Sequence, residues 1–210
     1  METTNSSTIK SILVGLLLVS SLQITAQSKK DNMTIQTNQP APSFTIKDVN
    51  GKDISLSDFK GKKILLTFYR NVGCPICNLR FHELQLHSDY FTAKGLTLIA
   101  VYESTAENMK QYLENEKFNA IMIPNSDLSL YNLYSIENSI WKMTKGMFNG
   151  AMGKMNDGKK LFKKDIEQDG NTFRISADFL IDEKGNIQTA YYGKFIGDHL
   201  PIDDINKFLN

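Results

Sequence analysis

Three near-continuous apolar runs, separated by segments of helical pattern, constrain the fold of this 210-residue chain most strongly. The runs cover residues 63–69, 96–102 and 120–124, and strands that are buried on both faces have this composition. The segments between them place apolar residues three and four positions apart, which indicates helices. Strand, helix, strand, helix, strand predicts a parallel sheet with right-handed crossovers, and therefore an α/β fold.

Antiparallel strands are predicted on both sides of this unit. Residues 43–48 alternate apolar and polar side chains, and an Asn-Gly pair separates them from residues 53–56, which predicts an N-terminal β-hairpin. Residues 173–182 and 187–192 flank a turn, which predicts two antiparallel strands that make the central sheet mixed. A last helix is predicted from Pro201, because proline suits the first helical position.

Residues 136–171 interrupt this plan as an insertion rich in lysine and methionine before the last two strands. A helix is predicted there, because apolar residues recur at helical spacing, at Ile136, Ile140, Met143, Met147, Ala151 and Met155. Between positions 142 and 165 the sequence contains seven lysines and two aspartates, which gives a local net charge of +5. We expect the apolar stripe to cover the sheet and the lysines to face water. The alternative is a basic, methionine-lined surface for a partner or an acidic membrane.

The first 26 residues have the pattern of a secretory signal. Lys10 precedes an apolar run of about ten residues, about half of what a membrane-spanning helix needs, and the small residue Ala26 follows. We expect cleavage after Ala26 and export, with membrane contact only through this segment before cleavage; an uncleaved anchor is the alternative. Residues 27–40 are polar and are expected to form a flexible leader to a single domain, residues 41–210.

Charge and cysteine content narrow the possible functions. The net charge is +1, from 24 basic and 23 acidic residues, and only three residues are arginines. A nucleic-acid partner is therefore not expected. Two cysteines cannot build the framework of several disulfides that supports small secreted scaffolds.

The two cysteines stand in a Cys74-Pro75-Ile76-Cys77 motif, between the strand at 63–69 and a helix predicted to run to about Lys94. Proline at the first helical position would put both sulfurs in the first turn. Side chains three apart on a helix have Cβ atoms about 5–6 Å apart, so a small adjustment would allow a disulfide. The N–H groups and the dipole of the helix start stabilise a thiolate there. Such a thiolate can attack an oxidised substrate, and the second thiol then closes a disulfide.

Three other uses of these cysteines are less favoured. Two inert, buried cysteines would not need to stand at a helix start. A structural zinc site would need two more ligands, and His82 and His87 lie roughly one and two helical turns beyond Cys77. A purely structural disulfide would close a very short loop, which stabilises little. Redox activity is therefore the preferred interpretation.

The chain resembles the peroxiredoxin-like members of the AhpC/TSA (redoxin) family. The resemblance rests on Ala41-Pro-Ser-Phe44, residues 64–70, Gly73-Cys-Pro-Ile-Cys77, residues 179–186 and residues 190–201. It implies a thioredoxin-like α/β fold: a central mixed sheet flanked by helices, with the N-terminal hairpin and the helical insertion added. It also implies a periplasmic location in the bacterial envelope, because exported redoxins of Gram-negative bacteria are found there.

The family's motif implies roles for particular residues. In peroxiredoxins a Pro-x3-Thr/Ser-x2-Cys motif holds the cysteine that attacks the peroxide and becomes a sulfenic acid. Cys77 matches that cysteine, Cys74 takes the place of the threonine, and Arg70 that of the proline. The resemblance thus implies a thiol peroxidase in which Cys77 attacks a hydroperoxide and Cys74 closes the disulfide. Arg70 and Arg174 are expected to supply positive charge near the site, and Arg80 could do the same.

Two alternatives stay open at this point. In a thioredoxin-type oxidoreductase acting on protein disulfides, Cys74 would attack first and Cys77 would resolve. In a redoxin-like binding or chaperone module, the insertion would be the functional surface. For either enzyme, the resemblance implies an external dithiol reductant of thioredoxin type, no cofactor and no metal, and allows a homodimer.

Overall fold

The computed structural model describes residues 34–113, 118–162 and 167–210. Residues 35–210 form one compact unit, whereas the secretory signal expected in residues 1–26 lies outside the described residues. No helix in the described ranges has the length and apolar character needed to cross a bilayer.

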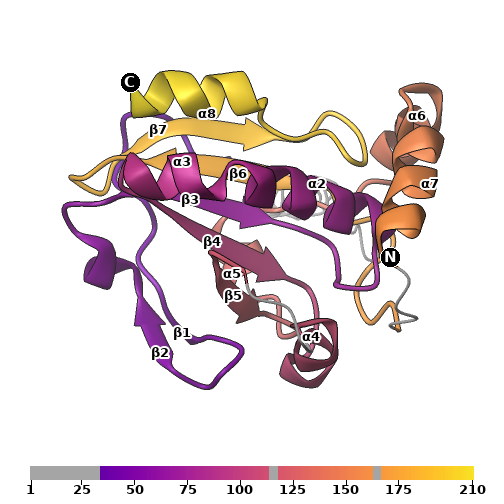
Figure 1. The fold of residues 1–210 in the computed structure, drawn as a ribbon, viewed down its shortest axis with the longest axis horizontal. Helices are drawn as coiled ribbons and strands as arrows, with labels where there is room; N and C mark the ends of the chain where they lie inside the picture. Colours follow the sequence, from indigo (N-terminus) through magenta and orange to yellow (C-terminus); the bar gives the residue numbers. More distant parts are fainter. Residues whose placement is uncertain (1–33, 114–117, 163–166) are drawn as a thin grey trace, which may run out of the picture. The chain divides into compact units, whose positions relative to one another are not determined.

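A five-stranded mixed sheet forms the centre of this unit (Figure 1). Its strands, in spatial order, are β5 (Ile121–Pro124), β4 (Leu96–Tyr102), β3 (Lys63–Phe68), β6 (Ala177–Ile181) and β7 (Ile187–Tyr192). The first three are parallel, β6 runs antiparallel to β3, and β7 runs antiparallel to β6. The mixed sheet predicted from the apolar runs is therefore confirmed.

The predicted N-terminal hairpin is also present, as a separate two-stranded sheet. Strand β1 (Thr45–Lys47) pairs antiparallel with β2 (Asp53–Ser55). Gly51 has φ +83 in the connecting turn, a conformation that glycine adopts without steric cost. A short 3₁₀ helix, η1 (Leu56–Phe59), then leads to β3.

The leader is ordered in the part that the structure describes. The N–H of Ile35 donates to the Tyr192 hydroxyl at 2.9 Å, and the N–H of Asn38 donates to the carbonyl of Ile187 at 2.7 Å. Pro40 also forms an isolated bridge with Asn186. Residues 35–40 are thus held against β7, and the expectation of flexibility does not describe them.

The segment after β3 forms two helices where the sequence predicted one. They are α2 (Pro75–Leu86) and α3 (Ser88–Ala93). At His87, between them, the backbone leaves helical geometry with φ −101 and ψ 3, and its N–H turns back to the carbonyl of Leu84. The remaining helices of the parallel unit and the C-terminus are α4 (Ala106–Leu113), α5 (Ser129–Leu133) and α8 (Ile202–Leu209).

The insertion forms two helices, α6 (Ile140–Phe148) and α7 (Ala151–Leu161), with Gly150 at φ +83 between them. Helix α7 packs on α2, and the pair stands beside the first turns of α2 (Figure 1). The expected apolar stripe packs inward only in part. Ile136 and Ala151 are buried, and Met143 and Met155 pack against the core, whereas Ile140 and Met147 are exposed.

Two apolar layers enclose the sheet, because successive side chains of each strand point to opposite faces. Leu65, Leu98 and Leu180 belong to the layer under α2, which contributes Phe81 and Leu84. The opposite layer contains Leu66, Ile99 and Phe179 together with residues of α5 and the segment after it, Leu130, Tyr131 and Tyr134. This arrangement fixes the carboxyl end of β3 directly before α2, where the two cysteines lie.

Candidate active site

The two cysteines lie side by side at the start of α2. Cys74 is the N-cap residue, and its sulfur accepts a hydrogen bond from the backbone N–H of Cys77 at 3.3 Å. The Cys77 thiol donates to the sulfur of Cys74, with the two sulfurs 2.6 Å apart. Both are free thiols. The predicted placement of both sulfurs in the first turn is therefore observed.

The environment separates the two thiols by acidity. Burial opposes ionisation of Cys74, but the hydrogen bond from the Cys77 thiol and the charge of Arg70 outweigh it. Backbone N–H groups at the helix start add to this effect, and the pKa of Cys74 falls to about 7. Burial raises the pKa of Cys77, and its hydrogen bond to Cys74 raises that pKa further. Cys74 is therefore the thiol that ionises near neutral pH, with about half of it present as thiolate at pH 7, while Cys77 keeps its proton.

The two predicted arginines have different surroundings. Arg70 is buried at the end of β3, where its charge favours the thiolate form of both cysteines, and one of its Nη atoms donates to Gln168 at 3.2 Å. Arg174 instead pairs with the buried carboxylate of Glu103 at 2.6 Å. Its guanidinium also lies 4.8 Å from the centre of the Tyr131 ring. Arg70 is therefore the arginine that acts on the dithiol.

Several buried polar atoms in the segment that carries the cysteines have no hydrogen-bond partner among the described residues. They are Tyr69 Oη, Arg70 Nε, Asn71 Nδ2 and Oδ1, and Asn78 Oδ1. Buried polar groups in proteins are nearly always bonded, to protein or to ordered water. These atoms are therefore left for ordered water or another small polar partner.

Two close backbone approaches cover the dithiol. A Cβ atom built on Gly158 of α7 would lie 2.1 Å from the carbonyl oxygen of Pro75, so only glycine permits this contact. On the other side, a Cβ on Gly197 would lie 2.6 Å from the side chain of Ile76. Cys74 and Cys77, on either side of these two residues, are only 1% and 5% exposed.

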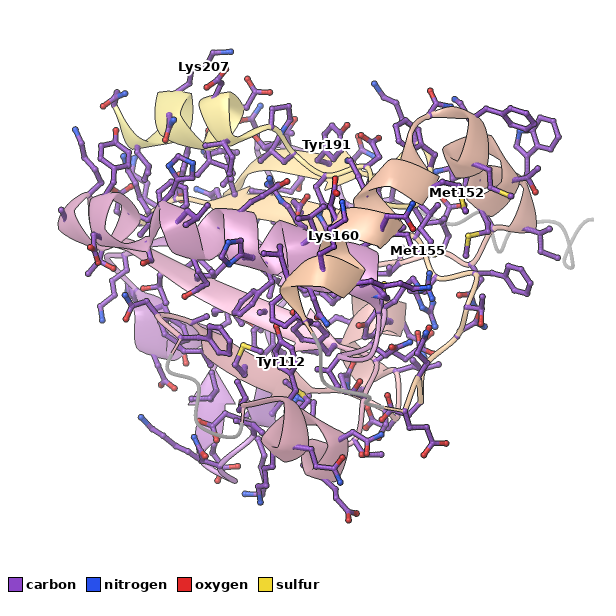
Figure 2. All side chains as sticks on the ribbon, turned by 45° about the vertical axis from the view of Figure 1, so that its right-hand side comes forward. Tyr112, Met152, Met155, Lys160, Tyr191 and Lys207 are labelled. Atoms are coloured by element: carbon purple, nitrogen blue, oxygen red, sulfur yellow. The ribbon has the colours of Figure 1, made fainter. Side chains whose placement is uncertain are left out.

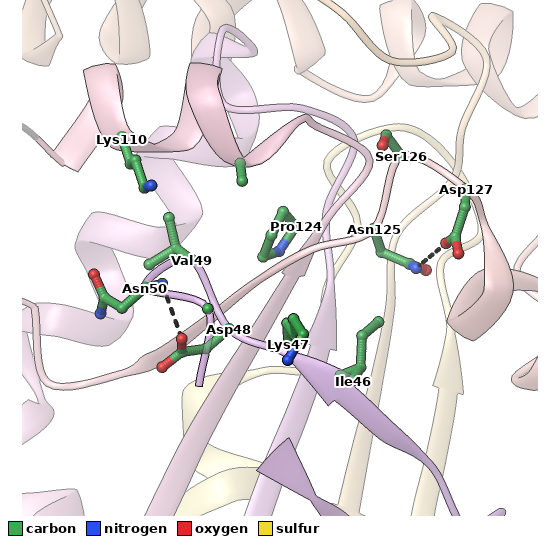
Figure 3. Close-up of a pocket in the computed structure, with 12 residues that line it drawn as sticks. Ile46, Lys47, Asp48, Val49, Asn50, Lys110, Pro124, Asn125, Ser126 and Asp127 are labelled. Atoms are coloured by element: carbon green, nitrogen blue, oxygen red, sulfur yellow. Dashed lines mark hydrogen bonds between the residues drawn. The ribbon is translucent and has the colours of Figure 1, made fainter. Parts of the chain in front are cut away.

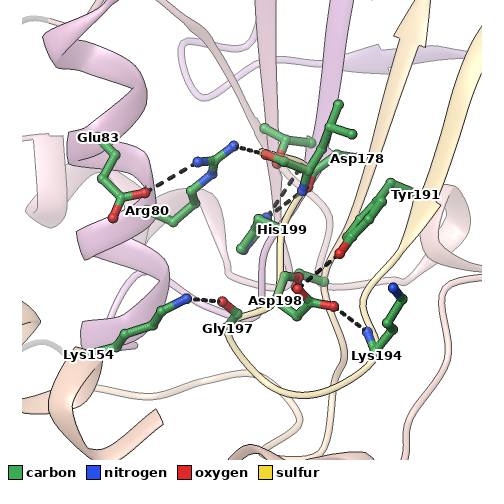
Figure 4. Close-up of polar contacts among 12 residues, drawn as sticks. Arg80, Glu83, Lys154, Asp178, Tyr191, Lys194, Gly197, Asp198 and His199 are labelled. Atoms are coloured by element: carbon green, nitrogen blue, oxygen red, sulfur yellow. Dashed lines mark hydrogen bonds and ion pairs between the residues drawn. The ribbon is translucent and has the colours of Figure 1, made fainter. Parts of the chain in front are cut away.

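A polar network fixes the loop that carries Gly197 (Figure 4). Asp178, fully buried on β6, lies 3.0 Å from Nδ1 of His199 and accepts a hydrogen bond from Thr67 at 2.6 Å. Burial opposes the charge of Asp178, but His199 outweighs it and lowers the pKa of this carboxyl. Lys154 of α7 donates to the carbonyl of Gly197 at 2.7 Å. The network thus joins the sheet, the loop and the insertion around the site.

A groove of about 420 Å³ lies elsewhere, between the hairpin, α4 and the end of β5 (Figure 3). Much of its polar lining is already used locally: Asp48 accepts from the backbone N–H of Asn50 at 2.8 Å, and Asn125 donates to Asp127 at 2.5 Å. Neither cysteine lines this groove. In the described ranges, no group of three or more His, Cys, Asp or Glu side chains could hold a metal ion.

Sequence reasoning missed the two buried carboxylates of this region, Glu103 and Asp178. Glu103 directly follows the apolar run at residues 96–102, and Asp178 lies within the apolar run at residues 177–181. An acidic residue in such a place needs a buried partner, which is the signal that could have found it. The partners Arg174 and His199 could not be assigned without the fold.

Comparisons with known proteins show the family of this chain. Residues 37–190 match the AhpC/TSA family. The peroxiredoxin Bcp of Escherichia coli (strain K12) is 24% identical over 139 residues, which cover 66% of this chain and 83% of that protein.

Solved structures show the thioredoxin-like fold. A thiol peroxidase from Chromobacterium violaceum superposes with a TM-score of 0.60 at 15% identity, covering 84% of this chain and 87% of that one. The peroxidoxin BcpB from Mycobacterium tuberculosis gives a TM-score of 0.59 at 12% identity, covering 83% and 94%. The predicted fold class is confirmed.

Proposed function

Because the chain belongs to the AhpC/TSA family of peroxiredoxin-like, thiol-dependent oxidoreductases, we propose that it reduces small hydroperoxides through Cys74 and Cys77. The observation that carries this proposal is the closed dithiol: a thiolate hydrogen-bonded to a protonated thiol and covered on two sides. A cover of this kind favours a small oxidant over a folded protein, whose disulfide would have to reach the attacking sulfur.

The acidity of the two thiols supports an order of events. The Cys74 thiolate attacks one peroxide oxygen, the O–O bond breaks, and Cys74 becomes a sulfenic acid. The departing alkoxide or hydroxide takes the proton of the Cys77 thiol, because that thiol is hydrogen-bonded to the sulfur of Cys74, where the O–O bond breaks. The Cys77 thiolate then attacks the sulfur of Cys74 and expels hydroxide. The sum is one dithiol in its monoanionic form plus ROOH, giving one disulfide, ROH and hydroxide.

This order reverses the one implied by the family motif, in which Cys77 attacks first. The motif match rests on position in the sequence, whereas the raised pKa of Cys77 makes it the poorer nucleophile at neutral pH. Arg70 supports the thiolate in either order. Asn71, with both amide atoms free of partners in the described chain, is available to the peroxide oxygens in place of the missing threonine hydroxyl.

Stopped-flow measurement of thiolate loss with hydrogen peroxide tests the function and the order together. Cys77→Ser keeps a hydrogen-bond donor beside Cys74, so it should still react with peroxide and accumulate sulfenic acid on Cys74. Cys74→Ser should react far more slowly. Sulfenic acid on Cys77 in the Cys74→Ser protein would restore the order of the motif while keeping the peroxidase function.

A thiol–disulfide oxidoreductase is the second candidate, favoured by the low pKa of Cys74 at a helix start. It would be the correct function if the reduced protein is inert to peroxide, reduces a protein disulfide rapidly, and forms a mixed disulfide at Cys74. In both cases an external dithiol protein of thioredoxin type would return the pair to its reduced form.

The N-terminal sequence supports export to the periplasm as part of the proposed function. The test is the mass of the protein recovered from a bacterial envelope fraction. Cleavage after Ala26 would leave Gln27 as the first residue. A full-length chain in the cytoplasmic fraction would contradict export.

A further inference from the structure

Helix α6 turns its apolar face away from the protein. Five of its residues share one face by helical spacing: Ile140, Trp141, Thr144, Met147 and Phe148. Of these, Trp141 is 78% exposed, Phe148 86%, Ile140 65% and Met147 59%. We call these five residues the outer face of α6. Met152 and Lys160 continue the exposed surface along α7 (Figure 2).

The inner face of α6 contributes one apolar side chain to the core, Met143, and is otherwise small and polar. Gly146 is buried, and a Cβ there would lie 2.3 Å from the side chain of Ile196. Lys142 pairs with Glu137 and donates to the carbonyl of Gly193 at 2.9 Å. A surface helix of a soluble protein normally has the opposite arrangement, with the apolar face toward the core. Apolar side chains gathered on an outward face mark an interaction site.

Charge indicates what covers this face. Residues 137–162 contain five lysines and two acidic residues, Glu137 and Asp157, which pair with Lys142 and Lys160. The segment therefore still carries +3, whereas the whole chain carries only +1. Lys145 lies one turn from Trp141 and is exposed. Docking of a second copy through the same face would bring like charges together. The occupant therefore carries negative charge.

The residue types distinguish a lipid surface from an acidic protein. Protein interfaces are enriched in arginine and depleted of lysine, yet every basic residue in 140–162 is a lysine. Tryptophan and phenylalanine on one side, accompanied by lysines, are the composition of helices that lie in the boundary between lipid headgroups and acyl chains. We propose that the outer face of α6 docks on an anionic lipid surface. This docking does not depend on the proposed peroxidase function, and it goes beyond the expectation that only the secretory signal meets a membrane.

The chain contains its own reporter, because Trp141 is its single tryptophan. The full chain is titrated with vesicles of phosphatidylglycerol and phosphatidylcholine, and with vesicles of phosphatidylcholine alone. With the anionic vesicles we expect a blue shift of the Trp141 emission, sedimentation of the protein with the vesicles, and loss of both at high salt. An apolar N-terminal segment that bound lipid by itself would not shift this emission.

Matched variants distinguish binding through the outer face of α6 from nonspecific adsorption of the protein to vesicles. Phe148→Ser should weaken binding to the anionic vesicles at least about ten-fold, because a phenyl ring no longer leaves water. Lys145→Gln should weaken it about five-fold. The controls Leu86→Ser, at an exposed leucine of α2, and Lys184→Gln, at an exposed lysine of the β6–β7 turn, should bind like the wild type. Peroxide reactivity without lipid should be the same in all four variants.

Three results would overturn the docking proposal. The first is an unchanged Trp141 emission with the anionic vesicles. The second is equal weakening by Phe148→Ser and Leu86→Ser. The third is a blue shift without lipid that grows with protein concentration, because this would identify a second copy as the occupant.

Discussion

Two neighbouring cysteines acquire different chemistry here from a few contacts. Sequence reasoning predicted that both sulfurs lie in the first turn of a helix and that one thiol ionises easily. It could not predict which one, because the answer depends on the direction of the thiol–thiol hydrogen bond and on the charge of Arg70. These are contacts of the folded chain, and the motif spacing does not encode them.

Removing the Cys77 thiol should make Cys74 less acidic. In Cys77→Ala the thiolate loses its hydrogen-bond donor, so the pKa of Cys74 should rise from about 7 toward that of an ordinary thiol. The ultraviolet absorbance of the thiolate, followed against pH, measures this. In the wild type, peroxide reactivity should increase as the pH rises through about 7 and then level off. A Cys74→Ala protein that still titrates near pH 7 would contradict the assignment.

The buried Asp178–His199 pair should contribute strongly to stability. Asp178→Asn removes the buried carboxylate that accepts hydrogen bonds from Thr67 and from the Leu200 N–H and that contacts His199, and the free energy of unfolding should fall by about 1–3 kcal/mol. Because the pKa of Asp178 is lowered in the folded protein, its contribution is present above the usual carboxyl pKa. It is lost as the pH falls through the folded-state pKa. Asp204→Asn, at an exposed ion pair with Lys207, is the control and should leave the free energy of unfolding nearly unchanged, because solvent screens such a pair. Chemical denaturation of both variants decides this.

Among the elements, the α6–α7 pair departs most from what the sequence predicted. The periodicity of residues 136–155 correctly predicted helix. It could not show that Gly150 divides the segment, nor that α6 presents its apolar face to solvent, because the same period fits either orientation. The break at His87 had no clear signal either, since neither glycine nor proline stands there.

A methyl group on Gly158 should lift α7 from α2. In Gly158→Ala the new Cβ would meet the carbonyl of Pro75. We expect a loss of about 1–3 kcal/mol of stability and faster alkylation of the two thiols by iodoacetamide. Gly153→Ala lies on the same helix with open space around it, so it should gain about 0.5–1 kcal/mol and leave alkylation unchanged. Equal alkylation rates in the two variants would mean that α7 does not limit access to the site.

For the whole molecule, the fold could be predicted because its information is local. Apolar runs of strand length, helical spacing between them and turn residues at the ends specify the mixed sheet without any long-range contact. The pairs that complete the site join residues far apart in the sequence, such as Arg174 with Glu103 and Asp178 with His199. These partners become visible only when the sheet brings β3, β4 and β6 together.

The stoichiometry of one turnover tests the central claim most directly. The fully reduced protein is mixed with an equimolar amount of hydrogen peroxide in the absence of a reductant, and the remaining thiols and peroxide are counted. The account predicts that each peroxide consumed removes both thiols and leaves one disulfide between Cys74 and Cys77. Unchanged thiols and unconsumed peroxide, with the same protein readily oxidised by a protein disulfide, would contradict it.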